Sequence, residues 1–286
     1  MIIIRFIGGL GNQMFQYLLY DQLKSININV KADINDFKSY KLHNGFELEK
    51  VFEINLDKAS NKEIKNLKDS SLQFLSRFRR KLLGKKKSHV YQNQMSLELI
   101  KKQRNLYLDG YWQSKKYINS SLSNPNKKFK FRLNPSKVNK DLINEINEFN
   151  SISIHVRRGD YLKLSDTFSK CTIGYYQTAI SHMETNLKNC VFYIFSNDIL
   201  WCKEKLIFNK SKFRFISHNS GINSYEDMRL MKMCKHNIIA NSSFSWWAAV
   251  LNDNSKKVVI SPKRWYVEKN MSDEIFIPNE WLKFDN

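Results

Sequence analysis

The sequence is poor in residues that stiffen or cross-link a chain. Its 286 residues include only four cysteines and four prolines, and no two cysteines have close-pair spacing. This pattern indicates neither a zinc site nor a disulfide framework, so we expect a reducing compartment. Acidic residues are also scarce, 27 against 47 lysines and arginines, which gives a formal charge of +20. Such a charge would suit nucleic acid, an anionic membrane surface or an acidic ligand.

Long hydrophobic runs are missing as well. The apolar segment at residues 1–7 is short and is interrupted by Arg5, so it predicts a first strand and not a signal peptide or membrane span. We therefore expect a cytoplasmic protein. The densest basic run, residues 77–87 (Arg77 to Lys87), could touch anionic lipid on the inner face of the plasma membrane, although a solvated face is the more ordinary explanation.

The chain is long enough for two domains of ordinary size. It is 42% hydrophobic and 13% aromatic, which excludes a disordered tail and allows sizeable cores. The stretch between about residues 119 and 150 has little apolar pattern and contains two prolines. We place the boundary near its end and predict domains at residues 1–145 and 146–286.

A glycine-rich turn follows the first strand. Residues 8–17 read GGLGNQMFQY and open a helix, and a second strand ends near Asp33. This is the pattern of a dinucleotide-binding start, in which the acid binds a ribose, but Met14 stands where the third glycine belongs. We expect the turn to bring its backbone close to a ligand, with Asn12 and Gln13 offering amide hydrogen bonds. A tight turn capped by Asn12 is the alternative.

An aromatic loop is predicted after another strand. Residues 106–109 are a strand pattern, and Tyr111 and Trp112 follow directly. Aromatic rings at such a place can stack on a sugar, and they can equally belong to the core.

A strand with a basic end lies in the middle of the chain. In residues 151–157 apolar side chains alternate with polar ones, so that His155 and Arg157 share one face and Arg158 follows on the other. The next two residues, Gly159 and Asp160, turn the chain out of the sheet. Two arginines and a histidine there suggest a nucleotide diphosphate, while an ion-paired strand end is the plainer alternative.

The second half alternates strands and helices, which predicts a mostly parallel sheet with helices on both faces. Strands are expected at residues 191–195, 213–216, 237–240 and 257–260, and helices at 175–187, around 200, at 224–234 and at 244–251. Residues 224–227 have capping-box spacing, and the methionines of that helix are expected in the core. Polar clusters at residues 196–198 and 241–243 also follow strands, so three clusters could converge on one crevice.

Five segments carry a family resemblance. They are residues 8–17, 110–114, 155–161, 195–198 and 241–247. Together they resemble the bacterial members of glycosyltransferase family 11, the GDP-fucose-dependent α-1,2-fucosyltransferases. The resemblance implies an α/β fold of the GT-B type, with two Rossmann-like domains facing each other across a cleft. It also implies inverting transfer of L-fucose from GDP-β-L-fucose to the 2-hydroxyl of a terminal galactoside.

The resemblance also implies roles for individual residues. Arg157 would bind the diphosphate with Arg158 in support, and Asn12 and Asp160 would lie at the catalytic centre, where Asp160 could instead orient an arginine. The implied donor-binding residues are His155, Arg157, Asn197, Asp198, Asn241, Ser242, Ser243, Phe244, Gly9, Gly11 and Gln13. No general base can be assigned.

Cofactors are not expected, since GDP-fucose is a substrate. The chain contains no Asp-x-Asp pair to hold a divalent ion on the diphosphate, so we also predict that no metal is required. The expected partners are GDP-fucose and a galactoside acceptor glycan, without nucleic acid. Three alternatives stay open: a fucosyltransferase of another linkage, an NAD-type oxidoreductase on the strength of the first turn, and a nucleic-acid binder on the strength of the charge.

Overall fold

A computed structural model describes most of the chain. The described residues are 1–39, 43–69, 84–118, 122, 124–158, 169–206, 212–267 and 275–286. The chain divides into two compact units, Met1–Arg132 and Leu133–Asn286, which we call the N-terminal and C-terminal units. The division lies earlier than the boundary at residue 145 expected from the sequence. The reason is that helix α8 (Lys137–Glu148) packs against β5 (Asn150–Val156) and α12 (Tyr225–Met233) and so belongs to the second unit.

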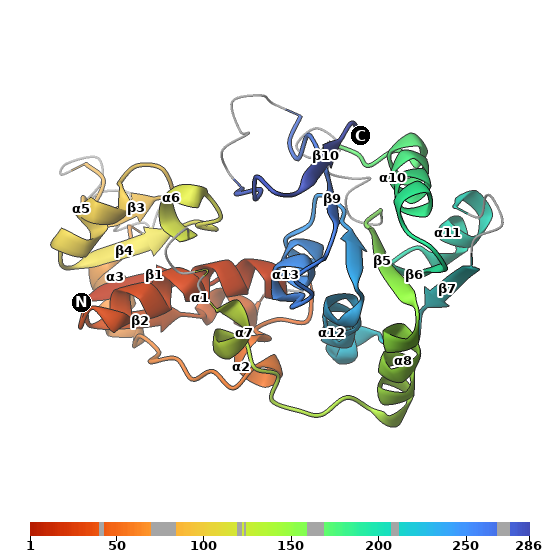
Figure 1. The fold of residues 1–286 in the computed structure, drawn as a ribbon. Helices are drawn as coiled ribbons and strands as arrows, with labels where there is room; N and C mark the ends of the chain where they lie inside the picture. The colour runs from red at the N-terminus through yellow and green to blue at the C-terminus, as the bar shows by residue number, and fades with distance from the viewer. Residues whose placement is uncertain are drawn as a thin grey trace. The chain divides into compact units, whose positions relative to one another are not determined.

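A parallel sheet forms the centre of the N-terminal unit (Figure 1). Its strands in spatial order are β2 (Val30–Asp33), β1 (Ile2–Arg5), β4 (Leu106–Asp109) and β3 (His89–Tyr91). The predicted first strand and the strand at residues 106–109 are confirmed, although β1 ends at Arg5. Ile2, Ile3 and Ile4 are fully buried, as expected for a strand covered on both faces. Because all strands are parallel, their carboxyl ends meet at one edge.

Short helices surround this sheet. They are α1 (Leu10–Ser25), η1 (Asn35–Lys38), α2 (Leu48–Val51), α3 (Asn61–Leu67), α5 (Leu97–Lys102), α6 (Lys115–Ile118) and α7 (Pro125–Lys128). Helix α1 is much the longest, and Met14 is buried within it. The side chain that departs from the dinucleotide-binding pattern therefore fills core space.

The C-terminal unit has a six-stranded parallel sheet. The spatial order is β10 (Leu282–Phe284), β9 (Val259–Pro262), β8 (His236–Ile238), β5, β6 (Cys190–Ser196) and β7 (Lys212–Ile216). The expectation of a mostly parallel sheet is confirmed. From β5 the chain builds outward through β6 and β7, and it later continues from β8 on the other side of β5. The β5–β8 pair is therefore a topological switch point, where open α/β sheets bind ligands.

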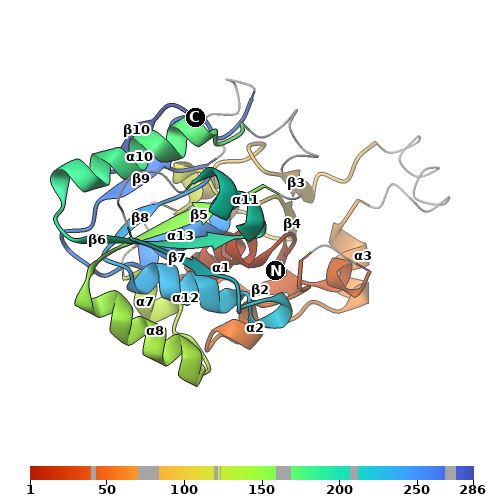
Figure 2. The same cartoon turned by 90° about the vertical axis from the view of Figure 1, so that its right-hand side faces the viewer.

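Helices cover both faces of this second sheet (Figure 2). Besides α8 and α12 they are α10 (Ile173–Asn186), α11 (Ile199–Lys205), η3 (Gly221–Asn223) and α13 (Ser243–Leu251). Ile152, Ile154 and Val156 pack with α10 and α11 in one buried cluster, which confirms the predicted alternation along β5. Met228 and Met231 of α12 are buried as expected. The capping-box prediction is wrong, because Ser224 has helical dihedrals and makes no side-chain capping hydrogen bond.

Two further features concern the cysteines and the lengths of the helices. All four cysteines are free thiols. No helix within the described part of the chain has the length and apolar character needed to cross a membrane. The basic run at residues 77–87 lies largely outside the described residues, so its contact with lipid stays a prediction.

Candidate functional site

His155 lies one residue before the end of β5 and is buried. Its ring centroid is 5.9 Å from that of Phe244 in α13, so the start of α13 lies beside the end of β5. Burial, followed by the positive charge of Arg157, lowers the pKa of His155 to about 3. The imidazole is therefore neutral at physiological pH, and its buried Nδ1 has no hydrogen-bond partner among the described residues. A neutral ring with one open nitrogen suits an uncharged polar group of a ligand.

The two arginines after His155 have different surroundings. The Arg158 backbone N–H donates to Asn197 Oδ1 at 3.1 Å, and Arg158 Nε donates to Asp198 Oδ2 at 3.3 Å. Its guanidinium also lies 3.9 Å from the ring centroid of Trp201, a cation–π contact. Arg158 is thus held by the segment after β6. Arg157 directly follows β5 and is half-buried, and its contact with an anion stays a prediction.

The polar residues after β6 make hydrogen bonds mainly within the protein. Asp198 caps α11 by accepting from the Trp201 backbone N–H at 3.2 Å, and its own N–H donates to Ser196 Oγ at 2.9 Å. Asn197 is exposed. The structure does bring Asn197 and Asp198 to Arg158, as the predicted convergence required. Their described contacts are with the protein, so donor binding by Asn197 and Asp198 stays a prediction.

The segment after β8 leads into helix α13. Asn241 Nδ2 donates to the carbonyl oxygens of Ser169 at 2.5 Å and Trp265 at 3.1 Å, so both amide hydrogens tie distant segments together. Ser242 is the extended N-cap residue of α13, and its side chain makes no capping hydrogen bond. Ser243 and Phe244 form the first turn of the helix. Backbone N–H groups and the positive end of the helix dipole therefore meet the end of β5, an arrangement that stabilises an anion.

The glycine-rich turn of the N-terminal unit is tightly built. Gly8 has φ +78°, and a Cβ atom there would lie 2.4 Å from Asn12 Nδ2, so only glycine fits. Gly9 is the N-cap residue of α1, and Gly11 is buried inside the helix. Asn12 is half-buried, and its Oδ1 accepts from Gln113 Nε2 at 2.8 Å.

The Gln13 side chain hydrogen-bonds to four backbone groups of the N-terminal unit. Its Nε2 donates to the carbonyl oxygens of Gly8 at 3.0 Å and Gly45 at 2.9 Å. Its Oε1 accepts from the backbone N–H groups of Glu47 at 2.9 Å and Leu48 at 3.1 Å. The side chain is fully buried and all of its usual bonds are made. In this structure Gln13 joins α1 to the start of α2 and has nothing left for a ligand, contrary to the role predicted for it.

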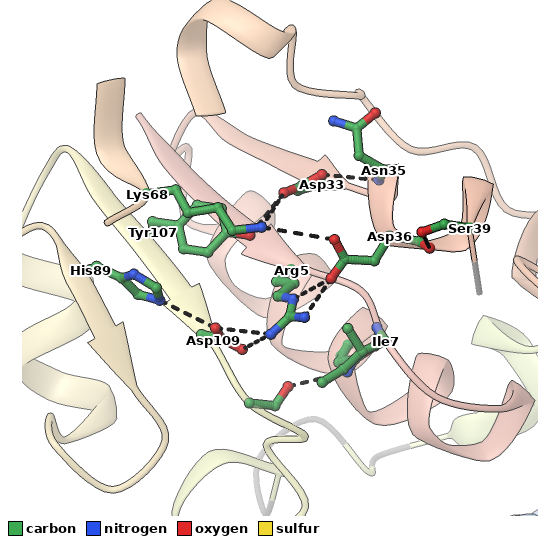
Figure 3. A network of polar contacts seen from close by, with 12 residues as sticks. Arg5, Ile7, Asp33, Asn35, Asp36, Ser39, Lys68, His89, Tyr107 and Asp109 are labelled. Carbon is green, nitrogen blue, oxygen red and sulfur yellow. Dashed lines mark hydrogen bonds and ion pairs between the residues drawn. The ribbon is translucent and has the colours of Figure 1, made fainter. Parts of the chain in front are cut away.

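Asp33 does not behave as a ribose-binding acid. Its carboxylate is buried, Oδ2 accepts from the Tyr107 hydroxyl at 2.8 Å, and Oδ1 accepts from the Asn35 backbone N–H at 3.0 Å (Figure 3). With both oxygens engaged inside the unit, the geometry counts against an NAD-type oxidoreductase.

The remaining expectations concern the aromatic loop, Asp160 and a metal site. Trp112 is fully buried and belongs to the core, whereas Tyr111 is 44% exposed. Asp160 lies outside the described residues. Within the described ranges, no three His, Cys, Asp or Glu side chains are grouped so that they could hold a metal ion. Trp201 was missed by sequence reasoning, because only the pairing of β5 with β6 brings residues 158 and 201 together.

Comparison with known proteins gives matches along the whole chain. Residues 1–285 match the family described as glycosyl transferase family 11. An alpha-1,2-colitosyltransferase of Escherichia coli is 32% identical over 99% of both chains. The O-antigen biosynthesis glycosyltransferase WbnK of Escherichia coli is 30% identical over 93% of this chain and 95% of its own. Galactoside alpha-(1,2)-fucosyltransferase 1 of Leontocebus fuscicollis is 30% identical over 35% of this chain and 28% of its own.

Proposed function

This chain belongs to glycosyltransferase family 11, and we propose that it transfers L-fucose from GDP-β-L-fucose to the 2-hydroxyl of a terminal galactoside with inversion. The observation that carries the proposal is the end of β5, where neutral His155 lies beside Phe244 in the first turn of α13 at the switch point of the sheet, with Arg157 two residues further along the chain. The α-1,2 linkage is supported by the names of two relatives. We further propose the GT-B arrangement for the two units, as expected from the family.

The chemistry needs stabilisation of the leaving group. As the bond between fucose and phosphate breaks, positive charge develops on the sugar and extra negative charge on GDP. Arg157 and the N-terminus of α13 stabilise this negative charge without reorganising during the reaction, and loss of one such donor typically costs roughly 3 kcal/mol in the barrier. An acceptor hydroxyl that attacks the face opposite to GDP turns the β-linked donor into an α-linked product.

The remaining residues of the site support this step. His155 offers Nδ1 to the uncharged guanosine part of the donor. Arg158 is a positioning residue, because Asp198 and Trp201 fix its guanidinium and its backbone N–H donates to Asn197, which holds the chain next to Arg157. Ser242 and Ser243 meet the phosphates through the first turn of α13. Metal independence stays part of the proposal.

A second donor is favoured by one observation. The relative that is 32% identical over nearly the full length is named a colitosyltransferase. Colitose is L-fucose without its 3-hydroxyl group, so a site that accepts one sugar needs little change to accept the other. The name of WbnK supports a bacterial surface glycan as acceptor. We further propose that the enzyme acts in the cytoplasm, with residues 77–87 as the segment that would touch anionic lipid.

Calorimetric titration tests the donor site. The protein is titrated with GDP, GDP-fucose, GDP-colitose and GDP-mannose in the presence of EDTA, and the linkage of any transferred sugar is determined. We expect GDP to bind, Arg157→Ala to abolish binding, and Arg158→Ala to weaken it less. Arg214→Ala is the matched control, because Arg214 of β7 lies outside the site and pairs with Glu145 at 3.0 Å. A folded wild-type protein that binds no guanine nucleotide would refute the proposal.

A further inference from the structure

A second polar network lies at the carboxyl edge of the N-terminal sheet (Figure 3). Arg5 and Asp109 are the last residues of β1 and β4, and Asp36 lies in η1 just after β2. Arg5 Nη1 donates to both oxygens of Asp109 at 2.9 and 3.0 Å, and Arg5 Nε donates to Asp36 Oδ2 at 2.7 Å. Burial alone would lower the pKa of Arg5, but its bonds to Asp109 and Asp36 raise it above the ordinary value. The cation that holds the network therefore stays charged.

Most acceptor groups of this network are already in use. His89 Nδ1 accepts from the Asp69 backbone N–H at 3.0 Å, so the ring hydrogen is on Nε2, which lies 3.2 Å from Asp109 Oδ2. Asp109 thus accepts from both Arg5 and His89. His89 has both ring nitrogens engaged, and the Asp109 side chain is only 11% exposed, so neither is presented to a ligand.

Asp36 is the exception. Its Oδ2 accepts from Arg5, but its Oδ1 accepts no hydrogen bond from any residue that the structure describes. The nearest charge to Oδ1 is Lys68 Nζ at 3.8 Å, which is too long for a hydrogen bond. The Asp36 side chain is 34% exposed, and Arg5 fixes its orientation. The network therefore presents one preoriented carboxylate oxygen, on a partly exposed side chain, at the edge of the sheet.

An exposed aromatic ring belongs to the same edge. Tyr111 follows β4 by two residues, and the charges of Arg5 and Asp109 act on its hydroxyl, whose pKa is raised chiefly by burial. Gln92 Oε1 accepts from the backbone N–H groups of Tyr111 at 2.8 Å and Trp112 at 2.7 Å, which fixes the loop. The buried Trp112 anchors it from below the surface. The Tyr111 ring is thus a rigid and accessible platform.

We propose that Tyr111 and Asp36 form a saccharide subsite for the acceptor, in which a hexopyranoside stacks on the Tyr111 ring and donates a hydroxyl to Asp36 Oδ1. A pyranose has an apolar C–H face and an edge of hydroxyl groups, which match an aromatic platform beside a carboxylate. An anion is disfavoured by the open oxygen of Asp36. The identification of this sugar as the acceptor rests on the proposed function.

Saturation-transfer NMR on the full-length protein tests the subsite without the donor. The probe is methyl β-D-galactopyranoside, and urea unfolding confirms that each variant is folded. We expect saturation of the sugar ring protons in the wild type, and a roughly tenfold loss of affinity in Tyr111→Ala and in Asp36→Asn. Tyr111→Phe keeps the ring and should bind as the wild type does. Glu53→Gln is the control, because Glu53 is an exposed carboxylate of the same unit, paired with Lys130 at 2.9 Å.

The outcomes separate the subsite from the donor site. No saturation transfer in the wild type, or unchanged affinity in a folded Tyr111→Ala protein, would overturn the subsite. Unchanged affinity in a folded Asp36→Asn protein would overturn the part given to the carboxylate. GDP is titrated into the same samples, and failure of GDP to bind counts against the proposed donor site alone. Normal GDP binding with weakened sugar binding in Tyr111→Ala supports the subsite.

Discussion

Replacement of Asp227 by Asn should change how the stability of the C-terminal unit depends on pH. Asp227 lies on α12, and its Oδ1 accepts from Asn219 Nδ2 at 2.9 Å. Burial, and to a lesser degree the negative charge of Glu226, raises the pKa of Asp227 from 3.8 to about 7. The folded state therefore binds the proton more tightly than the unfolded state does. The stabilisation is complete below the unfolded pKa and is lost as the pH rises through the folded pKa.

The size of the effect follows from the two pKa values. With 3.8 in the unfolded chain and about 7 in the folded one, Asp227 loses up to about 2.5 kcal/mol of unfolding free energy between pH 5 and pH 8. Asn has nearly the same shape, can accept the same bond from Asn219 and carries no charge. The Asp227→Asn protein should therefore be more stable than the wild type at pH 8 and lose less stability between pH 5 and pH 8.

Urea unfolding followed by tryptophan fluorescence measures this difference. All tryptophans except Trp112 lie in the C-terminal unit, so the signal reports mainly on that unit. Groups that titrate elsewhere in the protein are common to the wild type and the variant, so their effect cancels in the comparison. Asp253→Asn is the control, because the Asp253 side chain is 74% exposed. If Asp227→Asn and the wild type lost equal stability between pH 5 and pH 8, the argument from burial would be refuted.

Two further predictions concern the glycine-rich turn. Gln13→Ala leaves four backbone groups without their hydrogen-bond partner, so it should lower the unfolding free energy by roughly 2–4 kcal/mol. Urea titration measures this loss, and unchanged stability would show that the Gln13 side chain does not hold these segments together. Gly8→Ala should destabilise the protein more than Gly45→Ala does, because both residues have positive φ but only at Gly8 does a new Cβ meet a close neighbour, Asn12. Equal losses in thermal unfolding of the two variants would show that the close approach is unimportant.

The order and type of the main elements could be predicted from the sequence. Alternation along β5 fixed which side chains face α10 and α11, because a one-residue shift would bury the polar set against these helices. The parallel sheet of the second half followed from strands that alternate with helices. Ends of elements were less predictable. Ser224 has the residue type of an N-cap but adopts helical dihedrals, and pattern alone does not determine that conformation.

Individual hydrogen bonds could not be predicted, and they decide which polar residues of a motif remain available to a ligand. Gln13 and Asn241 are polar residues in recognisable motifs, yet their amides are consumed by backbone groups far away in the sequence. His155 Nδ1 and Asp36 Oδ1 differ, because burial or an ion pair fixes each group while one acceptor atom stays open among the described residues. The buried His155 Nδ1 has no protein partner among the described residues, which costs stability that a ligand can return, whereas Asp36 Oδ1 belongs to a partly exposed side chain and lies 3.8 Å from Lys68 Nζ. We therefore base the two proposed binding positions on open acceptors of preoriented side chains, and not on motif membership alone.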